Sequence, residues 1–71
     1  MGMETFVENA KRICKNQGIA VSVACVNAGL SMTWFSDIVH KGTRPRIDAV
    51  QAFASSLGVT VSELLAKEGG S

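Results

Sequence analysis

The sequence predicts a small all-α domain, and three observations support this expectation. The chain has 71 residues, of which 46% are hydrophobic and 18% are charged, as is typical of a globular domain with one core. Apolar residues recur three and four positions apart in several segments, which is the spacing of an amphipathic helix. Glycines follow these segments, where they can adopt the positive φ that closes a helix.

The first helix is expected over residues 6–17. Thr5 and Glu8 have the spacing of a capping box at its start, and a glycine follows its end. The next segment, from Val21, fits two patterns, because its valines alternate as in a strand while its alanines and cysteine form a helical stripe closed by Gly29. We favour a helix, since both flanking segments are helical and no partner strand is found.

A third helix is expected over residues 32–40, with Ser31 as its N-cap. Its apolar positions are Trp34, Phe35 and Ile38, three and four residues apart. Residues 41–45 then form a loop, because Pro45 disfavours helical backbone at the residue before it.

A fourth helix is expected over residues 47–57, with Gly58 as its stop, and Thr60 and Glu63 form a second capping box that starts a short fifth helix. The apolar face of the fourth helix comprises Ile47, Val50, Phe53, Ala54 and Leu57, and the core side of the fifth comprises Val61, Leu64 and Leu65. We expect an N-terminal tail over 1–5, one domain over 6–67 and a flexible tail over 68–71.

Residues 21–40 have the pattern of two helices that cross over a tight turn. Cys25 is small enough for close helix approach, and Gly29 can take the positive φ that such a turn requires. Phe35 and Ile38 can anchor the second helix in the core. This arrangement is a helix-turn-helix, and it points to nucleic acid as the partner.

Composition excludes several classes of function. No segment approaches the ~20 apolar residues of a membrane span, and no signal-like segment is present, so we expect a cytoplasmic protein without a membrane partner. Cys14 and Cys25 do not form a metal motif, and His40 adds no second ligand at zinc spacing, so we expect reduced core thiols, no metal and no cofactor. Because the net charge is only +1, positive charge that binds a polyanion such as DNA must be concentrated on one part of the surface.

The chain resembles the lambdoid-phage repressor and Cro family of helix-turn-helix domains, also called the Xre or Cro/CI type, over about residues 6–65. The motifs that carry the resemblance are Pro45-Arg-Ile47, Ala54-Ser-Ser-Leu-Gly-Val59 and Thr60-Val-Ser-Glu-Leu-Leu65, together with Ala24, Cys25, Gly29, Leu30, Ser31 and Phe35 in the helix-turn-helix. The resemblance implies a compact five-helix, lambda-repressor-like DNA-binding domain with the helix-turn-helix at helices 2 and 3, in a transcriptional regulator such as a phage or mobile-element repressor.

The chain departs from this family at several positions. An arginine on helix 1 and a glutamate at the end of helix 3 often pair in the family, and Cys14 and Val39 stand there instead. Loss of both charges together is physically coherent, because apolar groups can replace a buried ion pair at little cost. The glycine after helix 3 is one residue late, at Gly42, and Val21 stands where a phosphate-binding glutamine is common.

The resemblance implies that helix 3 enters the major groove of double-stranded DNA with Met32, Thr33 and Asp37 facing the bases. Methionine and a threonine methyl can contact a thymine methyl, and an aspartate can accept from a cytosine amino group. The alternative is that Met32 and Thr33 form an ordinary exposed first turn and that Asp37 is only solvated.

Phosphate contacts require only positive charge, hydroxyls or backbone N–H groups at the edge of a groove. The expected set is Ser31, Lys41, Thr43, Arg44 and Arg46. Arg46 stands where the family usually has a capping Ser or Thr, and a cation at a helix N-terminus opposes the helix dipole. A residue that breaks a local rule is a functional candidate, and the resemblance suggests a role at the minor groove. The alternative is a charged loop kept for solubility.

One small domain covers about one half-site, so we expect a homodimer on DNA with recognition helices about 34 Å apart. Candidates for the dimer interface are Leu57, Val59, Val61 and Leu65, with core packing as the alternative for each. A rival function is a protein-interaction module, antitoxin-like or an adaptor, whose valine-rich helix 2 binds a protein partner. The sequence gives no support for an enzyme, because no acid/base pair, activated nucleophile or phosphate loop is found.

Overall fold

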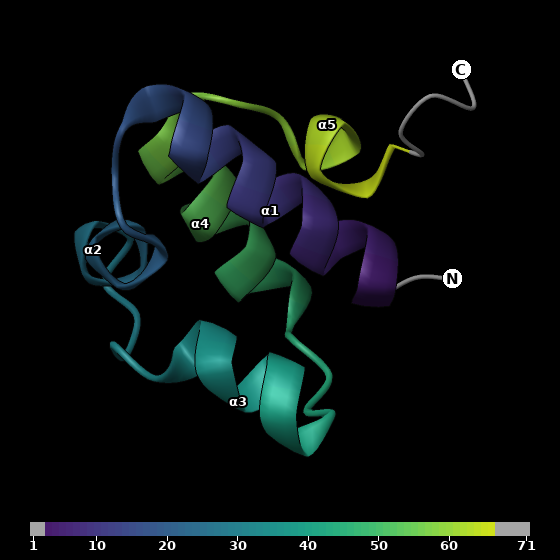
Figure 1. Cartoon of the computed structure of the whole chain (residues 1–71). Helices are drawn as coiled ribbons and strands as arrows, with labels where there is room; N and C mark the ends of the chain where they lie inside the picture. The colour runs from purple at the N-terminus through teal and green to yellow at the C-terminus, as the bar shows by residue number, and fades with distance from the viewer. Residues whose placement is uncertain (1–2, 67–71) are drawn as a thin grey trace.

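A computed structural model describes residues 3–66 and contains five α-helices and no strand within that range (Figure 1). The helices are α1 (Met3–Gln17), α2 (Val21–Asn27), α3 (Trp34–Lys41), α4 (Ile47–Leu57) and α5 (Val61–Leu65). α1 packs against α2 and α5, and α4 packs against the same two helices, while α3 packs beside α2. The predicted all-α, five-helix class is therefore confirmed. None of the described helices is long and apolar enough to span a membrane.

Local sequence signals placed the last two helices correctly. α4 has the predicted bounds and ends at Gly58, whose φ is 71°. The predicted capping box of α5 is formed, because the Thr60 hydroxyl accepts from the Glu63 N–H at 3.1 Å while the Glu63 carboxylate accepts from the Thr60 N–H at 2.8 Å. Both boundaries depend on groups within four residues of each other, which is why the sequence predicted them.

Two helix starts differ from the prediction. α1 begins at Met3, so Thr5 lies inside the helix and does not cap it, and residues 3–5 are not a tail. Methionine and glutamate are good helix formers, which favours this extension toward the N-terminus. α3 begins at Trp34, so Ser31 is not its N-cap.

The turn between α2 and α3 is a Schellman motif centred on Gly29. Its φ of 80° is the left-handed conformation that the sequence predicted. The Gly29 N–H donates to the Val26 carbonyl at 2.9 Å, and the Leu30 N–H donates to the Cys25 carbonyl at 2.8 Å. These bonds satisfy the last carbonyls of α2 and turn the chain toward α3.

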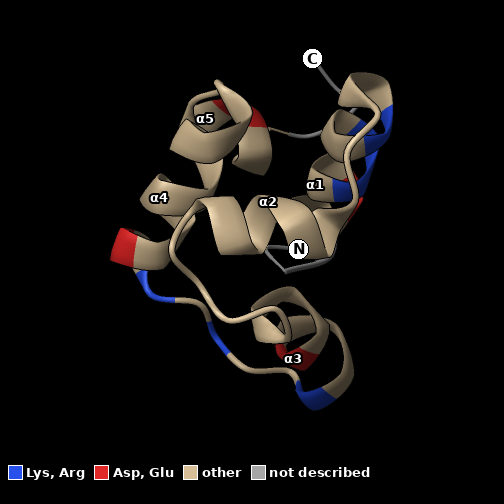
Figure 2. Cartoon of the chain, turned by 90° about the vertical axis from the view of Figure 1, so that its left-hand side faces the viewer, with Lys and Arg blue, Asp and Glu red and all other residues tan. Residues whose placement is uncertain are grey.

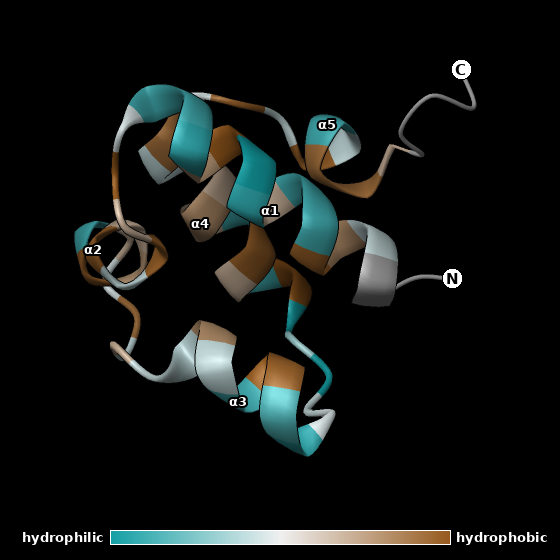
Figure 3. Cartoon of the chain, viewed as in Figure 1, coloured by the Kyte–Doolittle hydropathy of each residue, from teal (hydrophilic) through white to brown (hydrophobic). Residues whose placement is uncertain are grey.

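The core is built around four aromatic rings from three helices. Phe6 of α1 and Phe53 of α4 are fully buried, and their ring centroids are 6.1 Å apart. Trp34 and Phe35 of α3 each contact both of these rings, at centroid distances of 5.3 to 6.2 Å. The start of α3 is thereby attached to α1 and α4. Figure 3 shows the hydrophilic outward face of α1 in front of the more hydrophobic α4.

Side-chain amides on α1 satisfy the ends of two other helices. The Asn9 amide is completely buried and donates to the carbonyls of Leu64 at 2.8 Å and Ala66 at 2.6 Å. The Gln17 amide donates to the Leu57 carbonyl, the last of α4, at 2.7 Å. Such bonds replace water at helix C-termini that are otherwise left with unpaired carbonyls. The sequence analysis had not identified either amide.

Two residues predicted in the core are exposed. Ile47 at the start of α4 is 58% exposed and Leu65 at the end of α5 is 47% exposed. Both residues lie on the apolar face of their helix but at its end, where no other described helix covers them. Val50, Phe53, Ala54, Leu57 and Leu64 are buried as predicted.

Cys14 and Cys25 are free thiols buried in the core, as expected. Burial raises the pKa of both, and Cys25 raises the pKa of Cys14 further, whereas a hydrogen bond from the Phe35 backbone partly opposes the shift at Cys25. A raised pKa means that the folded chain resists forming a thiolate that the unfolded chain forms readily.

We therefore expect the two buried thiols to make thermal stability fall as the pH rises. The protonated thiols contribute fully to the free energy of unfolding below about pH 9. This contribution is lost as the pH rises through the raised pKa values, because the thiols of the unfolded chain ionise first. Melting temperatures measured from about pH 8 to pH 10 should fall less steeply in Cys14→Ala/Cys25→Ala than in the wild type. Lysine titration is common to both proteins, so parallel curves would contradict the expectation.

Candidate nucleic-acid interface

Met32 and Thr33 belong to the turn that leads into α3 and are exposed, with Met32 at 63%. The Trp34 N–H donates to the Ser31 carbonyl at 3.0 Å, which closes this turn, and the first helical bond runs from Asp37 N–H to the Thr33 carbonyl at 2.8 Å. The structure thus places two of the three predicted base-facing residues ahead of α3. Asp37 is half-buried one turn later.

The Ser31 hydroxyl organises this turn instead of capping the helix. It accepts from the Thr33 N–H at 3.2 Å and shares a hydrogen bond with the Thr33 hydroxyl at 3.0 Å. Thr33 occupies the N-cap position without a side-chain cap bond. Both hydroxyls are exposed, so they can exchange this bond for one to a phosphate oxygen.

Asp37 and Lys41 form an ion pair on α3. Their charged atoms are 3.7 Å apart, and the two side chains are 41% and 72% exposed, respectively. An exposed pair of this spacing contributes less than about 1 kcal/mol, so it holds neither side chain firmly. The pair does reduce the repulsion that a lone carboxylate would exert on a polyanion.

Residues 41–46, which comprise the last residue of α3 and the loop to α4, carry the predicted phosphate anchors Lys41, Thr43, Arg44 and Arg46, all of them exposed, and we call this segment the cationic loop. Figure 2 shows its three cations along one edge of the molecule, next to the end of α3. The other described cations, Lys11, Arg12 and Lys15, lie on α1. The loop therefore places local positive charge beside α3, although the chain as a whole has a net charge of only +1.

Arg46 occupies the N-cap position of α4, as predicted. Its backbone is extended, with φ of −79° and ψ of 148°, and its side chain makes no cap hydrogen bond. A cation here faces the positive end of the helix dipole, and Asp48 in the first turn offsets part of this cost. The positive charge of Arg46 therefore does not stabilise the start of α4.

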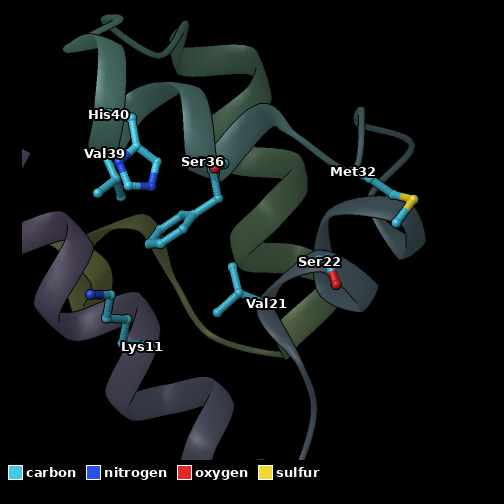
Figure 4. Close-up of a pocket in the computed structure, with 8 residues that line it drawn as sticks. Lys11, Val21, Ser22, Met32, Ser36, Val39 and His40 are labelled. Carbon is cyan, nitrogen blue, oxygen red and sulfur yellow. The ribbon is translucent and has the colours of Figure 1, made fainter.

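A surface hollow of about 300 Å³ lies between α1, α2 and α3, and we call it the α1–α2–α3 hollow. Its lining comprises Lys11, Val21, Ser22, Met32, Phe35, Ser36, Val39 and His40. In Figure 4, Lys11 and His40 lie at one end of the hollow, whereas Ser22 and Met32 lie at the other.

The sequence analysis did not identify the four polar residues of this lining as candidates for a site. They are Lys11, Ser22, Ser36 and His40. They come from three different helices, so no local spacing connects them. The helical positions of Ser36 and His40, four residues apart on the same face of α3, were the only available signal.

The proposed dimer residues divide into three groups by burial. Leu57 is 4% exposed and belongs to the core, so it cannot form an interface and is withdrawn as a candidate. Val59 and Val61 are half-buried and pack against the core. Leu65 is exposed and lines a second hollow of about 180 Å³ with Phe6, Pro45, Ile47 and Val50.

The valines of α2 also differ from one another. Val21 packs against the core, whereas Val23 is 47% and Val26 is 53% exposed. The outer side of α2 thus presents two apolar side chains with no charged residue on the same helix. These two residues are the surface on which the protein-interaction alternative depends.

No protein-family model and no curated protein matches the chain. Among solved structures, the chain is similar to a crystal structure of a hypothetical transcription factor, NHTF, from Neisseria. The TM-score is 0.86 at 20% sequence identity, and the match covers 96% of this chain and 78% of the other. This similarity shows that the two chains share a fold.

Proposed function

We propose that the protein is a DNA-binding transcriptional regulator of the Cro/CI type. The observation that carries the proposal is the exposed cationic loop of Lys41, Arg44 and Arg46 directly beside an exposed helix-turn-helix. Phosphate contacts provide most of the affinity of such proteins, and this loop places three positive charges where the backbone of a duplex would run. A repressor of phage or mobile-element origin is the form that the resemblance suggests.

In the proposed complex, α3 enters the major groove from its N-terminal end. Met32 and Thr33 then approach base edges, and Ser31 contacts a phosphate at the groove edge. Neither Met32 nor Thr33 can form the bidentate hydrogen bonds by which arginine recognises guanine. We therefore expect modest base specificity and an affinity that depends mainly on backbone contacts.

A homodimer is part of the proposal, because a single copy covers too few base pairs for tight binding. Exposed Ile47 takes the place of Leu57 as an interface candidate beside Leu65, since Ile47 and Leu65 line the same hollow with Pro45. Val59 and Val61, which are half-buried, stay candidates. Covering such side chains with a second copy removes apolar area from water.

The alternative is a protein-interaction module of the same fold. The exposed Val23 and Val26 on α2 favour it, because adjacent apolar side chains on a charge-free helix fit a protein partner better than a phosphate. The cationic loop favours DNA. Selection from random-sequence duplexes separates the two functions.

Selection should enrich a palindromic sequence, and binding measured by fluorescence anisotropy should weaken steeply with salt, since cation–phosphate contacts release counterions. Measurements at several salt concentrations would give the slope. An absence of both enrichment and low-salt affinity would exclude the DNA-binding function.

Arg46→Ala should weaken DNA binding and reduce the magnitude of the salt slope by about 1 per copy, or about 2 for the proposed dimer, because each copy loses one phosphate contact. Thermal stability should stay level or rise, since the positive charge at the start of α4 is removed. Lys15→Ala, which removes an exposed cation from α1, serves as the matched control. A large decrease in melting temperature with an unchanged salt slope would mean that Arg46 has a structural role.

Ile47→Ser/Leu65→Ser should raise the dimer dissociation constant at least about tenfold, because apolar contacts are lost from the proposed interface. Val23→Ser/Val26→Ser is a control of similar exposure on α2 and should leave dimerisation unchanged. Sedimentation velocity with and without duplex DNA provides the measurement. Equal dissociation constants for the first variant and the wild type would contradict this interface.

A further inference from the structure

The α1–α2–α3 hollow has a chemical character that DNA binding does not explain. Val21, Met32, Phe35 and Val39 supply apolar surface along it, and Met32 and Val39 are 63% and 40% exposed. Sugar-phosphate backbone is bound through cations, hydroxyls and backbone N–H groups, none of which these four side chains provide. Exposed apolar side chains around a concave surface are instead typical of a site for a partly apolar ligand.

The polar groups of the hollow are the Lys11 ammonium, the His40 imidazole and two serine hydroxyls. Lys11 and His40 lie together at one end (Figure 4), and none of the residues that line the hollow is acidic. Neither Lys11 nor His40 forms an ion pair with a carboxylate of the described residues. Ser22 and Ser36 add hydroxyls that can donate to an anion. The charge of the hollow therefore complements an anionic group.

The polar and apolar residues are not mixed evenly along the hollow. The end with Lys11 and His40 is separated by Val21 from the other end, where Met32 lies. An occupant that fits has a negative head group at one end and an apolar body. A volume of about 300 Å³ lies at the lower end of the range for small-molecule sites, so the occupant must be small.

We propose that the α1–α2–α3 hollow binds a small amphipathic carboxylate, such as a short fatty acid or an aromatic acid, and that this ligand releases DNA. The carboxylate lies between Lys11 and His40, and the apolar body contacts Val21, Phe35, Val39 and Met32. The release of DNA rests on the proposed function, whereas binding of the carboxylate does not.

The coupling follows from the position of the hollow. Met32 borders it and is also expected to face the bases, so a ligand body against Met32 alters the surface presented to the groove. A bound carboxylate also offsets the positive charge of Lys11, which reduces the attraction of this surface to phosphate. By linkage, DNA must lower the affinity for the carboxylate by the same factor as the carboxylate lowers the affinity for DNA.

The test titrates the uniformly ¹⁵N-labelled full chain with octanoate, hexanoate, benzoate and phenylacetate. Each acid is compared with its primary amide, which has nearly the same shape but no charge. We expect saturable shifts of the backbone amides of Val21, Ser22, Ser36, Val39 and His40 for at least one acid. The matching amide should bind at least about tenfold more weakly, because a charge-assisted hydrogen bond is lost.

Lys11→Gln/His40→Gln should weaken binding of that acid by about tenfold or more while leaving the fold intact, since both side chains are exposed. Lys15→Gln removes a lysine that does not line the hollow and should leave the affinity unchanged. Val39→Ser should weaken octanoate binding through lost apolar contact.

The acid that binds is then added at saturation to the protein–DNA complex, where we expect at least about a threefold weaker affinity for DNA. The proposal is overturned if no acid gives saturable shifts at the hollow below about 10 mM, if acid and amide bind equally, or if saturation leaves DNA affinity unchanged. If the protein binds no DNA at all, the proposed function fails, but the titrations still decide whether the hollow is a carboxylate site.

Discussion

The position of α3 depends on one aromatic cluster. Phe6 and Phe53 are completely buried, and the rings of Trp34 and Phe35 pack against both. α3 has only eight residues and starts without a side-chain cap, so its orientation comes from this packing and from Ile38 rather than from its own stability. Everything proposed for the surface of α3 requires these rings to hold its first turn against α1 and α4.

The candidate site is built from groups that the fold does not need. The cations of the α3–α4 loop are exposed, and Arg46 opposes the dipole of the helix that it precedes. The polar groups that do serve the fold, the amides of Asn9 and Gln17, bond to the C-terminal ends of α5 and α4. Stability and recognition thus depend on different residues, so changes in the loop can alter binding without unfolding the chain.

Local interactions explain which elements could be predicted from the sequence. Thr60 and Glu63 satisfy each other within one turn, and Gly29 closes α2 through bonds to the preceding turn, so their residue types and spacing suffice. The starts of α1 and α3 were predicted wrongly. At α3, the hydroxyl of Ser31 accepts from the N–H of Thr33 and forms a turn. A serine at this place in a sequence is equally compatible with a helix cap, so the residue type alone did not decide between the two.

By itself, the sequence determined the all-α class, the helix-turn-helix and the cationic loop, because periodicity, glycine conformation and charge are properties of neighbouring residues. Only the tertiary structure decided which apolar residues are covered. It placed Leu57 in the core, left Ile47 and Leu65 at the surface, and brought Lys11 from α1 to the same hollow as His40 from α3. Helix periodicity specifies a face of a helix, but whether that face is buried depends on where the other helices end.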